Sequence, residues 1–573
     1  MDKKPLTLEH ALYALALALA AGLRLPLLGS LPLSNAEAAW ALQALNLAHG
    51  LHPAIGPNPA YVQLTAATFY LFGASNFLAR FWPALAGTLL VLAPWFVRRR
   101  IGRIPALLLA FGLAIDPGLN ALSHLAGGPM LAIACLIGAT VFWLDRHRST
   151  AGLFAGLALL SGSSVWLGLL GLGLVGLIAR AFPLLRGGQP EQPSAGRLRP
   201  TWQELRPALI WCLGTMLVLG SLFLLSPQGI AAFAGSIPAF LTGWWTFSSV
   251  PLWRTLLAIP AYELLPLIFG LVGLVRAALT RNRLSLLLGI WALVALVLVA
   301  LYPGQQTPDL GWSILPLWTL TALELAHHLD FKGQNAWALA AVMTLMIVLV
   351  IFGWLDLASI TTMDLSTSDA KARLLLLAGV FLVAGLSLFL IGTGWSASLA
   401  RLGGVWSVVL LLTLWTIAYT TGAGGQRQPR TLELWQADPR TDNADVVLEV
   451  ANQISSWNTG QNSDLPLAIV NVDSPALVWL FRDWPVSQVS VLGPKQTPQM
   501  IITPGTVTSL NLSAAYRGEP LAWQQQAGWS TASASDWLNW LVYRQMPMQN
   551  TDIVLWVRSD LTIDNQGAPA TSP

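Results

Sequence analysis

The sequence predicts a mainly α-helical polytopic membrane protein that carries a small α/β domain at its C-terminal end. Of its 573 residues, 55% are hydrophobic and only 10% are charged, and the mean hydropathy is +0.60. A soluble globular protein carries about 25% charged residues. Apolar runs long enough to cross a bilayer recur as far as residue 421. Beyond that point, short alternating segments typical of strands and amphipathic helices replace them.

A transmembrane helix needs about 20 mostly apolar residues. By this criterion we expect spans near residues 9–29, 79–97, 104–121, 128–144, 150–163, 164–181, 207–226, 251–275, 284–302, 312–328, 334–354, 373–392 and 404–421. The total is about thirteen spans, and the pair between residues 150 and 181 is the shortest. The first run lacks a small-residue cleavage site and is followed by further spans, so we interpret it as a retained helix.

Arginines mark the side of the membrane on which each loop lies. Arg98, Arg99 and Arg100 belong to one set of loops that is rich in arginine, whereas the alternate loops hold few basic residues. Because basic loops stay in the cytoplasm, we expect a plasma-membrane protein with a cytoplasmic N-terminus and an extracytoplasmic tail. The basic pI of 9.2 arises from these loops and is no argument for nucleic-acid binding.

The predicted domains are a transmembrane region, residues 1–421, with a first outer loop at 30–78, and an extracytoplasmic domain, residues 422–573. A Gly/Pro-rich linker at 421–430 joins them. In the tail we expect strands at 466–473, 486–493, 499–504 and 552–561, and helices at 445–457, 474–483 and 535–545. No Gly-x-Gly-x-x-Gly follows a strand in this tail, so no nucleotide is assigned to it.

Ionisable residues within or beside the spans are functional candidates, because burying charge in a membrane is costly. The candidates are Arg80, Asp116, His124, Glu263 and Asp309. All except Glu263, which falls inside a span, lie toward the outer side and would line one outward cavity. Each also has a local explanation: Arg80 would extend to the interface, and Asp116, which precedes Pro117, would terminate a helix.

Metal-binding patterns are weak in this chain. Glu324, His327 and His328 resemble a metal cluster, but a solvated helix end at the inner side explains them more readily. Cys135 and Cys212 both lie in apolar runs and provide neither a disulfide framework nor a cysteine metal site.

The stretch from Ser34 to Gly50 in the first outer loop reads as an interfacial helix, with Trp40 and Leu47 opposite polar residues. Ser34 and Glu37 fit a capping box, in which a serine and an acid three residues later satisfy each other's N–H groups. This pattern explains Glu37 without a catalytic role, although the position of Glu37 in the first outer loop leaves such a role open.

The layout resembles the GT-C membrane glycosyltransferases, which include protein O-mannosyltransferases and aminoarabinose transferases. It is most similar to the prokaryotic flippase-activity-associated membrane proteins. The strongest match is AYVQLTAATFYLFGASNFLARFWPALAG, Ala60 to Gly87. AEAAWALQALNLAHG resembles the first-loop Asp-Glu helix of the family, and LLAIPAYELLPLIFGLVG resembles its Tyr-Glu span, retained as Tyr262 and Glu263. The resemblance covers nearly the whole chain.

The resemblance implies sugar transfer from a polyprenyl-phosphate carrier to an acceptor at the outer face. Glu37 would act as base or metal ligand, Arg80 and His124 would hold the carrier phosphate, and Glu263 would orient the sugar or acceptor. The remaining expected substrate-binding residues are His52, Tyr61, Asp116 and Tyr262. The expected partners are a polyprenyl-phosphate-linked sugar, the bilayer and a membrane protein, without nucleic acid. These residues assign no particular cofactor, and a divalent cation stays open.

Several charges of the family pattern are missing. Ala36 stands where the family has its Asp, and Gln305-Gln306 replace a Glu-Lys pair. Where the family carries Ser-Arg-x-x-Arg-x-Asp, this chain has Ser123, His124, Gly127 and Pro129, so both arginines and the Asp are missing. Transfer needs a base and positive charge for the departing phosphate, so the missing charges argue against catalysis. The favoured hypothesis, which rests on the resemblance, is an enzyme with a reduced site. The alternative is a catalytically degenerate relative that binds a lipid-linked sugar or supports a membrane complex. A transporter is disfavoured, because the sequence shows no inverted repeat or paired broken helices.

Overall fold

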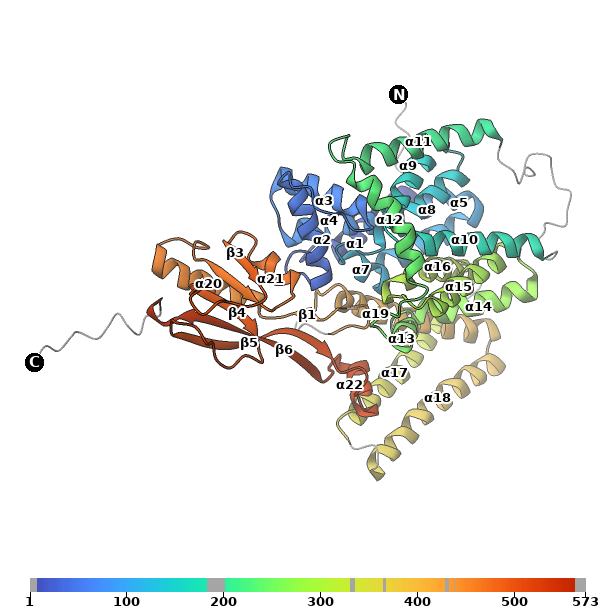
Figure 1. Ribbon diagram of the computed structural model, residues 1–573. Coiled ribbons are helices and arrows are strands. Elements are labelled where there is room, and N and C mark those ends of the chain that lie inside the picture. The colour runs from blue at the N-terminus through green and yellow to red at the C-terminus, as the bar shows by residue number, and fades with distance from the viewer. Residues whose placement is uncertain are drawn as a thin grey trace, which may run out of the picture. The chain divides into compact units, whose positions relative to one another are not determined.

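The computed structural model describes residues 8–182, 201–329, 335–363, 367–427, 432–436 and 438–561. The chain forms two compact units (Figure 1). The helical unit comprises Met1–Leu28, Ala44–Ala437 and Thr531–Met546, and the sheet unit comprises Gly29–Gln43, Asp438–Ser530 and Pro547–Pro573. A segment of the first loop therefore groups with the tail, and a segment of the tail groups with the helices.

Helices make up nearly all of the helical unit. They are α1 (Leu8–Arg24), α3 (Pro59–Phe72), α4 (Asn76–Leu90), α5 (Ala93–Ile101), α6 (Arg103–Ile115), α7 (Pro117–Ser123), α8 (Met130–Leu144), α9 (Arg148–Leu159), α10 (Ser164–Ala181), α11 (Trp202–Gly220), α12 (Gln228–Thr242), α13 (Leu252–Tyr262), α14 (Leu264–Thr280), α15 (Arg283–Leu301), α16 (Gly311–Ala326), α17 (Ala336–Ile360), α18 (Ser368–Gly394), α19 (Ala397–Ala423) and α22 (Ala534–Tyr543). A 3-10 helix, η2 (Thr307–Leu310), precedes α16, and α2 (Asn35–Ala48) runs from one unit into the other.

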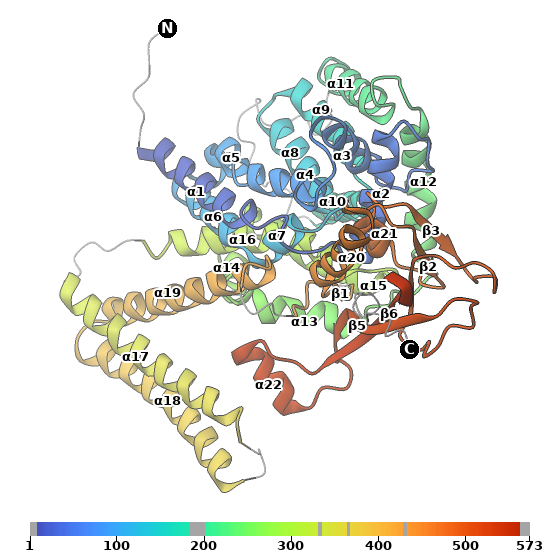
Figure 2. The same cartoon turned by 90° about the vertical axis from the view of Figure 1, so that its left-hand side faces the viewer.

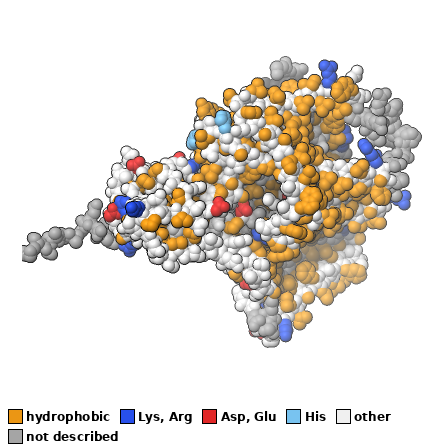
Figure 3. Space-filling model, in the orientation of Figure 1, with side chains coloured by type: hydrophobic (Ala, Val, Ile, Leu, Met, Phe, Trp, Pro, Cys, Tyr) orange, Lys and Arg blue, Asp and Glu red, His pale blue; other side chains and the backbone are white. Residues whose placement is uncertain are grey.

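Six of the described helices are long and apolar enough to cross a membrane. They are Asn76–Ile101, Ser164–Ala181, Arg283–Leu301, Ala336–Ile360, Ser368–Gly394 and Ala397–Ala423, and two bent helix pairs raise the number to 8. Apolar side chains cover much of the face of the helical unit seen in Figure 3. The protein is thus a multi-pass membrane protein. Each expected span overlaps a helix, but the total of about thirteen spans is not confirmed.

Two of the expected spans are broken rather than continuous. Helices α6 and α7 meet at 54° around Asp116, and α13 and α14 meet at 85° around Glu263. Asp116 takes an extended conformation, which the following proline favours. Glu263 therefore lies at a helix break and not inside a continuous span. The expectation that the chain has no paired broken helices was wrong, so this argument against a transporter no longer holds.

Helices α17 and α18 form a long hairpin beside α19 (Figure 2). Helix α18 is exposed over most of its length, and its buried residues are only Ala370 and Val380. Arg373 Nη1 on α18 contacts Oδ1 of Asp356 on α17 at 2.8 Å. Apolar helices with so little protein contact are suited to a lipid environment, in which the ion pair helps to hold the two helices together.

The sheet unit contains one six-stranded mixed sheet in the order β1-β5-β6-β4-β2-β3. The strands are β1 (Arg440–Thr441), β2 (Leu467–Val470), β3 (Val486–Val489), β4 (Met500–Pro504), β5 (Tyr516–Ala527) and β6 (Met548–Arg558). Strand β2 is parallel to β3 and β4, whereas β6 is antiparallel to β4 and β5. Ala468, Ile501, Val554 and Trp556 form a core cluster on this sheet. Helices α20 (Ala444–Thr459) and α21 (Pro475–Leu480) complete the unit.

The four expected strands correspond to β2, β3, β4 and β6, and the predicted α/β character of the tail is confirmed. The sequence analysis did not predict strand β5, because Gly518 and Pro520 interrupt its strand pattern. Proline is tolerated there because β1 is only 2 residues long, which leaves most of β5 as an edge strand.

Candidate functional site

Asp116 begins helix α7 at the break after α6. Its Oδ1 accepts the backbone N–H of Leu119 at 2.6 Å, and its Oδ2 accepts the indole N–H of Trp318 at 2.5 Å. The side chain is fully buried. The prediction that Asp116 terminates a helix is confirmed, and the carboxylate also caps the helix that follows.

Glu263 lies beside Asp116. Its Oε1 accepts the N–H of Gly118, at the start of α7, at 3.2 Å. The Glu263 and Asp116 carboxyl groups accept from the adjacent N–H groups of Gly118 and Leu119, and both are fully buried. The two helix breaks therefore bring these candidate acids together. Gly118 allows this close approach: a Cβ at that position would lie 2.5 Å from Ile314 and 2.6 Å from Trp435.

Arg24, at the end of α1, completes this cluster and was missed in the sequence. Its guanidinium donates to the carbonyls of Leu113 and Ala114 at 2.8 and 3.0 Å, and to Ser123 Oγ at 3.2 Å. These carbonyls belong to the last turn of α6, where the break removes their helical partners. Arg24 is fully buried, and its charge acts on Asp116. The sequence signal that could have identified Arg24 is its position as a lone arginine at the end of the first apolar run.

Tyr262 joins a second buried cluster. Its hydroxyl donates to Oε2 of Glu433 and accepts the N–H of Leu434 at 2.9 Å. Arg544, just after α22, lies 3.6 Å from Glu433 Oε2. The Arg544 guanidinium also stacks 4.8, 3.8 and 4.0 Å from the ring centres of Tyr262, Tyr419 and Trp540. Glu433 and Arg544, which the sequence analysis did not single out, thus hold α22 and the segment 432–436 against the Tyr262–Glu263 bend.

The remaining candidates in the helical unit make contacts with backbone carbonyls. Arg80 is buried and donates to the Leu28 carbonyl at 3.2 Å. Tyr61 is buried and donates to the Ala79 carbonyl at 2.7 Å. His124 ends α7, with Nδ1 2.9 Å from the Asn120 carbonyl. The burial of Arg80 differs from an arginine that extends to the interface, and the roles of these residues toward a ligand stay predictions.

An apolar groove of about 530 Å³ lies between the first-loop segment that follows α2 and helix α12. His52, Ile55 and Pro57 line one wall, and Gln228, Ala232 and Gly235 line the other. Gln228 Nε2 donates to the His52 carbonyl at 3.2 Å across the groove. Among the candidate substrate-binding residues, His52 lines this groove. Its small apolar lining suits a chain of hydrocarbon groups better than a charged headgroup.

Glu37 belongs to the sheet unit. Its Oε2 accepts the Ser34 N–H at 3.1 Å, and its own N–H donates to Ser34 Oγ at 3.3 Å. Both halves of the predicted capping box are therefore present. Glu37 is buried, whereas Ala36 is exposed. The local explanation of Glu37 is confirmed, and its catalytic role stays a prediction.

The late loop shows how this chain accommodates Gln305 where the resembled family has an acid. Gln305 is buried, and its Oε1 accepts from the Thr255 hydroxyl at 2.8 Å while its Nε2 donates to the Val250 carbonyl at 3.0 Å. A neutral amide satisfies both partners. Asp309 accepts from the Gln306 N–H at 3.0 Å and the Ser164 hydroxyl at 2.9 Å, and burial raises the pKa of its carboxyl.

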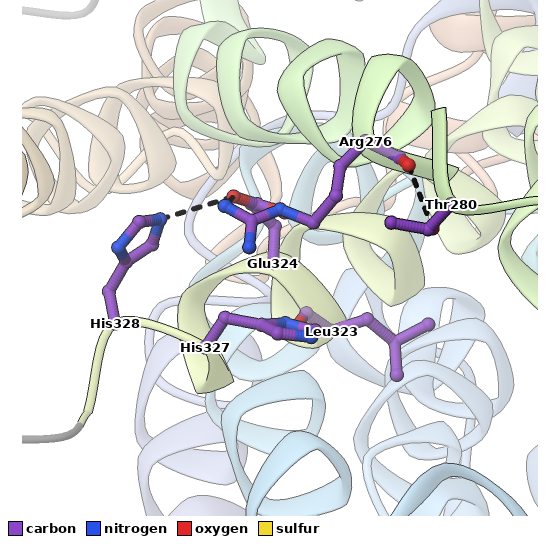
Figure 4. A network of polar contacts seen from close by, with 6 residues as sticks. All are labelled: Arg276, Thr280, Leu323, Glu324, His327 and His328. Atoms are coloured by element: carbon purple, nitrogen blue, oxygen red, sulfur yellow. Dashed lines mark hydrogen bonds and ion pairs between the residues drawn. The ribbon is translucent and has the colours of Figure 1, made fainter. Parts of the chain in front are cut away.

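Glu324 is not part of a solvated helix end, which corrects that interpretation. It is buried, and its Oε1 lies 2.7 Å from Arg276 Nη2 and 3.1 Å from His328 Nε2 (Figure 4). His327 turns instead to the Leu323 carbonyl at 2.7 Å. Within the described ranges, no three His, Cys, Asp or Glu side chains are grouped so that they could hold a metal ion.

The many apolar helices and the C-terminal sheet form a fold like that of a solved membrane protein, ArnT, and the predicted fold class is confirmed. The chain is similar to the crystal structure of ArnT from Cupriavidus metallidurans bound to undecaprenyl phosphate. The TM-score is 0.54 at 16% identity, covering 96% of this chain and 98% of that chain. The apo state of the same ArnT matches with a TM-score of 0.54 at 17% identity over the same shares. No protein-family model and no curated protein matches the sequence.

Proposed function

We propose that this protein binds a polyprenyl-phosphate-linked sugar and transfers the sugar to an acceptor at the outer face of the plasma membrane. The observation that carries the proposal is the likeness to ArnT over 96% of this chain, because that ArnT structure is bound to undecaprenyl phosphate. In this proposal the N-terminus is cytoplasmic and the tail is extracytoplasmic. Labelling of single cysteines placed in the tail, with a reagent that does not cross membranes, tests this orientation.

The groove beside α12 supports the lipid part of the proposal. A polyprenyl tail is a flexible hydrocarbon chain, and the small apolar side chains of Ala232 and Gly235 leave room for it. The His52 backbone and Gln228 bridge the groove at one point. In this proposal the tail occupies the groove, while Arg80 and His124 hold the phosphate through positive charge or hydrogen bonds.

Glu37 is the proposed base. Transfer with inversion needs a group that takes the proton from the acceptor, and a carboxylate performs this step. The substitution Glu37→Gln suits a test, because glutamine still provides an oxygen that accepts the Ser34 N–H in the capping box. Loss of activity in this variant would therefore not result from loss of the helix cap.

A catalytically degenerate relative is the second candidate. Two observations favour it: Ala36 replaces the family's acid, and Gln305 is fully bonded as a neutral amide. Such a protein would bind the lipid-linked sugar, or support a membrane protein that does, without turnover. It differs from the enzyme in retaining lipid binding with no transfer.

The deciding experiment measures transfer of a labelled sugar from a polyprenyl phosphate in membranes that contain wild type, Glu37→Gln or Glu204→Gln. Glu204, which pairs with Arg148 at 3.2 Å, provides the matched control. We expect transfer by wild type and Glu204→Gln, with a loss of at least 100-fold in Glu37→Gln. Lipid binding without any transfer would establish the second candidate. Transfer by Glu37→Gln at the wild-type rate would remove Glu37 from the mechanism. Repetition with a chelator tests the divalent cation.

A further inference from the structure

Two broken helices meet at their breaks, and each break carries one buried acid. Asp116 separates α6 from α7, and Glu263 separates α13 from α14. Glu263 accepts the N–H of Gly118 and Asp116 accepts the N–H of Leu119, so two neighbouring backbone amides place the carboxyl groups side by side. Neither acid has any exposed surface. Two neighbouring buried acids, inside the helical unit of a membrane protein, require an explanation in terms of charge.

The backbone and side-chain N–H groups at this junction already donate to three of the four carboxyl oxygens. Leu119 N–H and the Trp318 indole N–H supply the two oxygens of Asp116, and Gly118 N–H supplies Oε1 of Glu263. Among the described residues, no donor reaches Oε2 of Glu263. An ionised carboxylate accepts hydrogen bonds but cannot donate one. With both acids ionised, Oε2 of Glu263 would be a buried acceptor without a hydrogen, beside a second carboxylate that cannot donate one.

The geometry points to a proton held between Asp116 and Glu263, so that the two acids form a proton-binding site at the junction of the two broken helices. The proton converts one carboxyl group into a donor and gives the unsatisfied oxygen of Glu263 a partner. Asp116 and Glu263 are also expected substrate-binding residues, but a proton held between them does not require the proposed transfer reaction.

The sum of the charges around the two acids is zero when the pair holds one proton. Arg24 on α1 is a buried cation, and its guanidinium lies on the carbonyls of Leu113 and Ala114, close to Asp116 in the chain. Trp318 on α16 and Thr420 on α19, which donates to the Ile115 carbonyl, are neutral. Tyr262 turns its hydroxyl away, toward Glu433. One arginine, one carboxylate and one protonated acid sum to zero, whereas two carboxylates would leave a net negative charge in a medium of low dielectric constant.

A bound metal cation fits these surroundings less well than a proton. Hard cations such as Na⁺ or Ca²⁺ are surrounded by oxygen ligands. Here three of the four carboxyl oxygens already face N–H groups, which would repel a cation. The proton also has a mechanical consequence. With the proton, the breaks of α6–α7 and α13–α14 are bridged, whereas two like charges would push them apart.

Infrared spectroscopy tests the proposal, because the carbonyl stretch of a protonated carboxylic acid is separate from the bands of a carboxylate. The samples are the purified full-length wild type and Asp116→Asn, Glu263→Gln and Asp356→Asn in lipid nanodiscs at neutral pH. We expect wild type to show this band, and both Asp116→Asn and Glu263→Gln to lose the intensity of one acid group. Asp356→Asn is the control and should keep it, because Asp356 pairs with Arg373 at 2.8 Å.

A pH titration of the wild-type spectrum gives a result even if the variants do not fold. The band should disappear when the pH is raised far enough. Absence of the band in wild type at neutral pH, or its retention in both Asp116→Asn and Glu263→Gln, would overturn the proposal. A melting temperature that rises when Na⁺ replaces choline at constant ionic strength, and that loses this response in Glu263→Gln, would overturn it in favour of a cation.

Discussion

Asn35 Oδ1 accepts a hydrogen bond from the Ser474 hydroxyl at 2.8 Å, although the two residues are 439 positions apart in the chain. The same oxygen accepts the backbone N–H of Ala476, in the first turn of α21, at 3.2 Å. Helix α2 therefore begins against the sheet unit to which its first residues belong. Asn35 stands one position before Ala36, but its side chain is used to join α2 to α21.

Substitution of Asn35 by alanine should destabilise the sheet unit. The change removes two hydrogen bonds and leaves the Ala476 N–H without this acceptor, so we expect a loss of about 1–3 kcal/mol in the free energy of unfolding. Asn35→Asp retains an acceptor oxygen and should lose less. Denaturant titration of the purified protein, followed by tryptophan fluorescence, compares the two. Equal losses in Asn35→Ala and Asn35→Asp would contradict this role for the acceptor oxygen.

Arg24→Met should have a larger effect. The substitution leaves the buried carbonyls of Leu113 and Ala114 without their donor and removes a buried positive charge. Each unsatisfied buried acceptor costs about 1–3 kcal/mol. A strong decrease in thermal stability in detergent is expected. Arg99→Met at the exposed end of α5 is the control and should change stability by less than about 0.5 kcal/mol. Similar melting temperatures for both variants would refute the role of Arg24.

The sequence contains the information for the helices and for the local caps. Hydropathy located the apolar helices, the Asp116–Pro117 pair indicated a helix end, and the Ser34–Glu37 spacing identified the capping box. These features depend on residues within one or two helical turns of each other. Composition does not fix the number of spans, since a short apolar helix such as α8 has the composition of a span without its length.

The contacts that build the site depend on pairings between distant segments, and no local pattern specifies them. Arg24 pairs with carbonyls about 90 residues later, and Glu433 pairs with Arg544 from the tail. The 85° bend at Glu263 likewise has no unique local signal, because Pro260 lies within α13 without ending it. A buried acid in the sequence predicts that a polar or charged partner lies nearby. Which residue is that partner depends on the tertiary fold.

Arg544→Lys should release α22 from the helical unit. Lysine keeps the charge but loses the planar guanidinium that stacks on Tyr419 and Trp540. We expect faster hydrogen–deuterium exchange in residues 534–543 and 432–436, by at least 10-fold, while α8 and α16 remain protected. Arg517→Lys, on an exposed position of β5, is the matched control and should leave exchange in α22 unchanged. Unchanged protection of α22 in Arg544→Lys would show that charge alone holds the helix.

Gly118→Ala should disturb the junction of the two broken helices. The added methyl group would lie 2.5 Å from Ile314 and 2.6 Å from Trp435, closer than contacts between carbon atoms allow. Overpacking of this kind costs about 1–3 kcal/mol. Gly176→Ala, on an exposed face of α10 with no atom within 4 Å, should instead stabilise its helix by up to about 1 kcal/mol. We expect the melting temperature to fall in Gly118→Ala and to rise in Gly176→Ala. A Gly118→Ala protein as stable as wild type would show that the junction relaxes to accommodate the methyl group.

Asp309 should give the protein a pH-dependent stability. Burial raises the pKa of its carboxyl, and the hydrogen bonds from the Gln306 N–H and the Ser164 hydroxyl oppose the shift only in part. The folded state therefore holds this proton more tightly than the unfolded state. The contribution to stability is complete below the unfolded pKa of about 3.9 and is lost as the pH rises through the raised folded pKa.

Asp309→Asn should remove this part of the pH dependence. Asparagine presents an oxygen to the Gln306 N–H and an amide N–H to Ser164, and it carries no charge that burial could penalise. Melting temperatures from about pH 4 to pH 8 should therefore fall less steeply toward high pH in Asp309→Asn than in wild type. Asp483→Asn, at an exposed position, should follow the wild-type curve. Parallel curves for wild type and Asp309→Asn would mean that Asp309 has the same proton affinity in the folded and unfolded states, contrary to the effect of its burial.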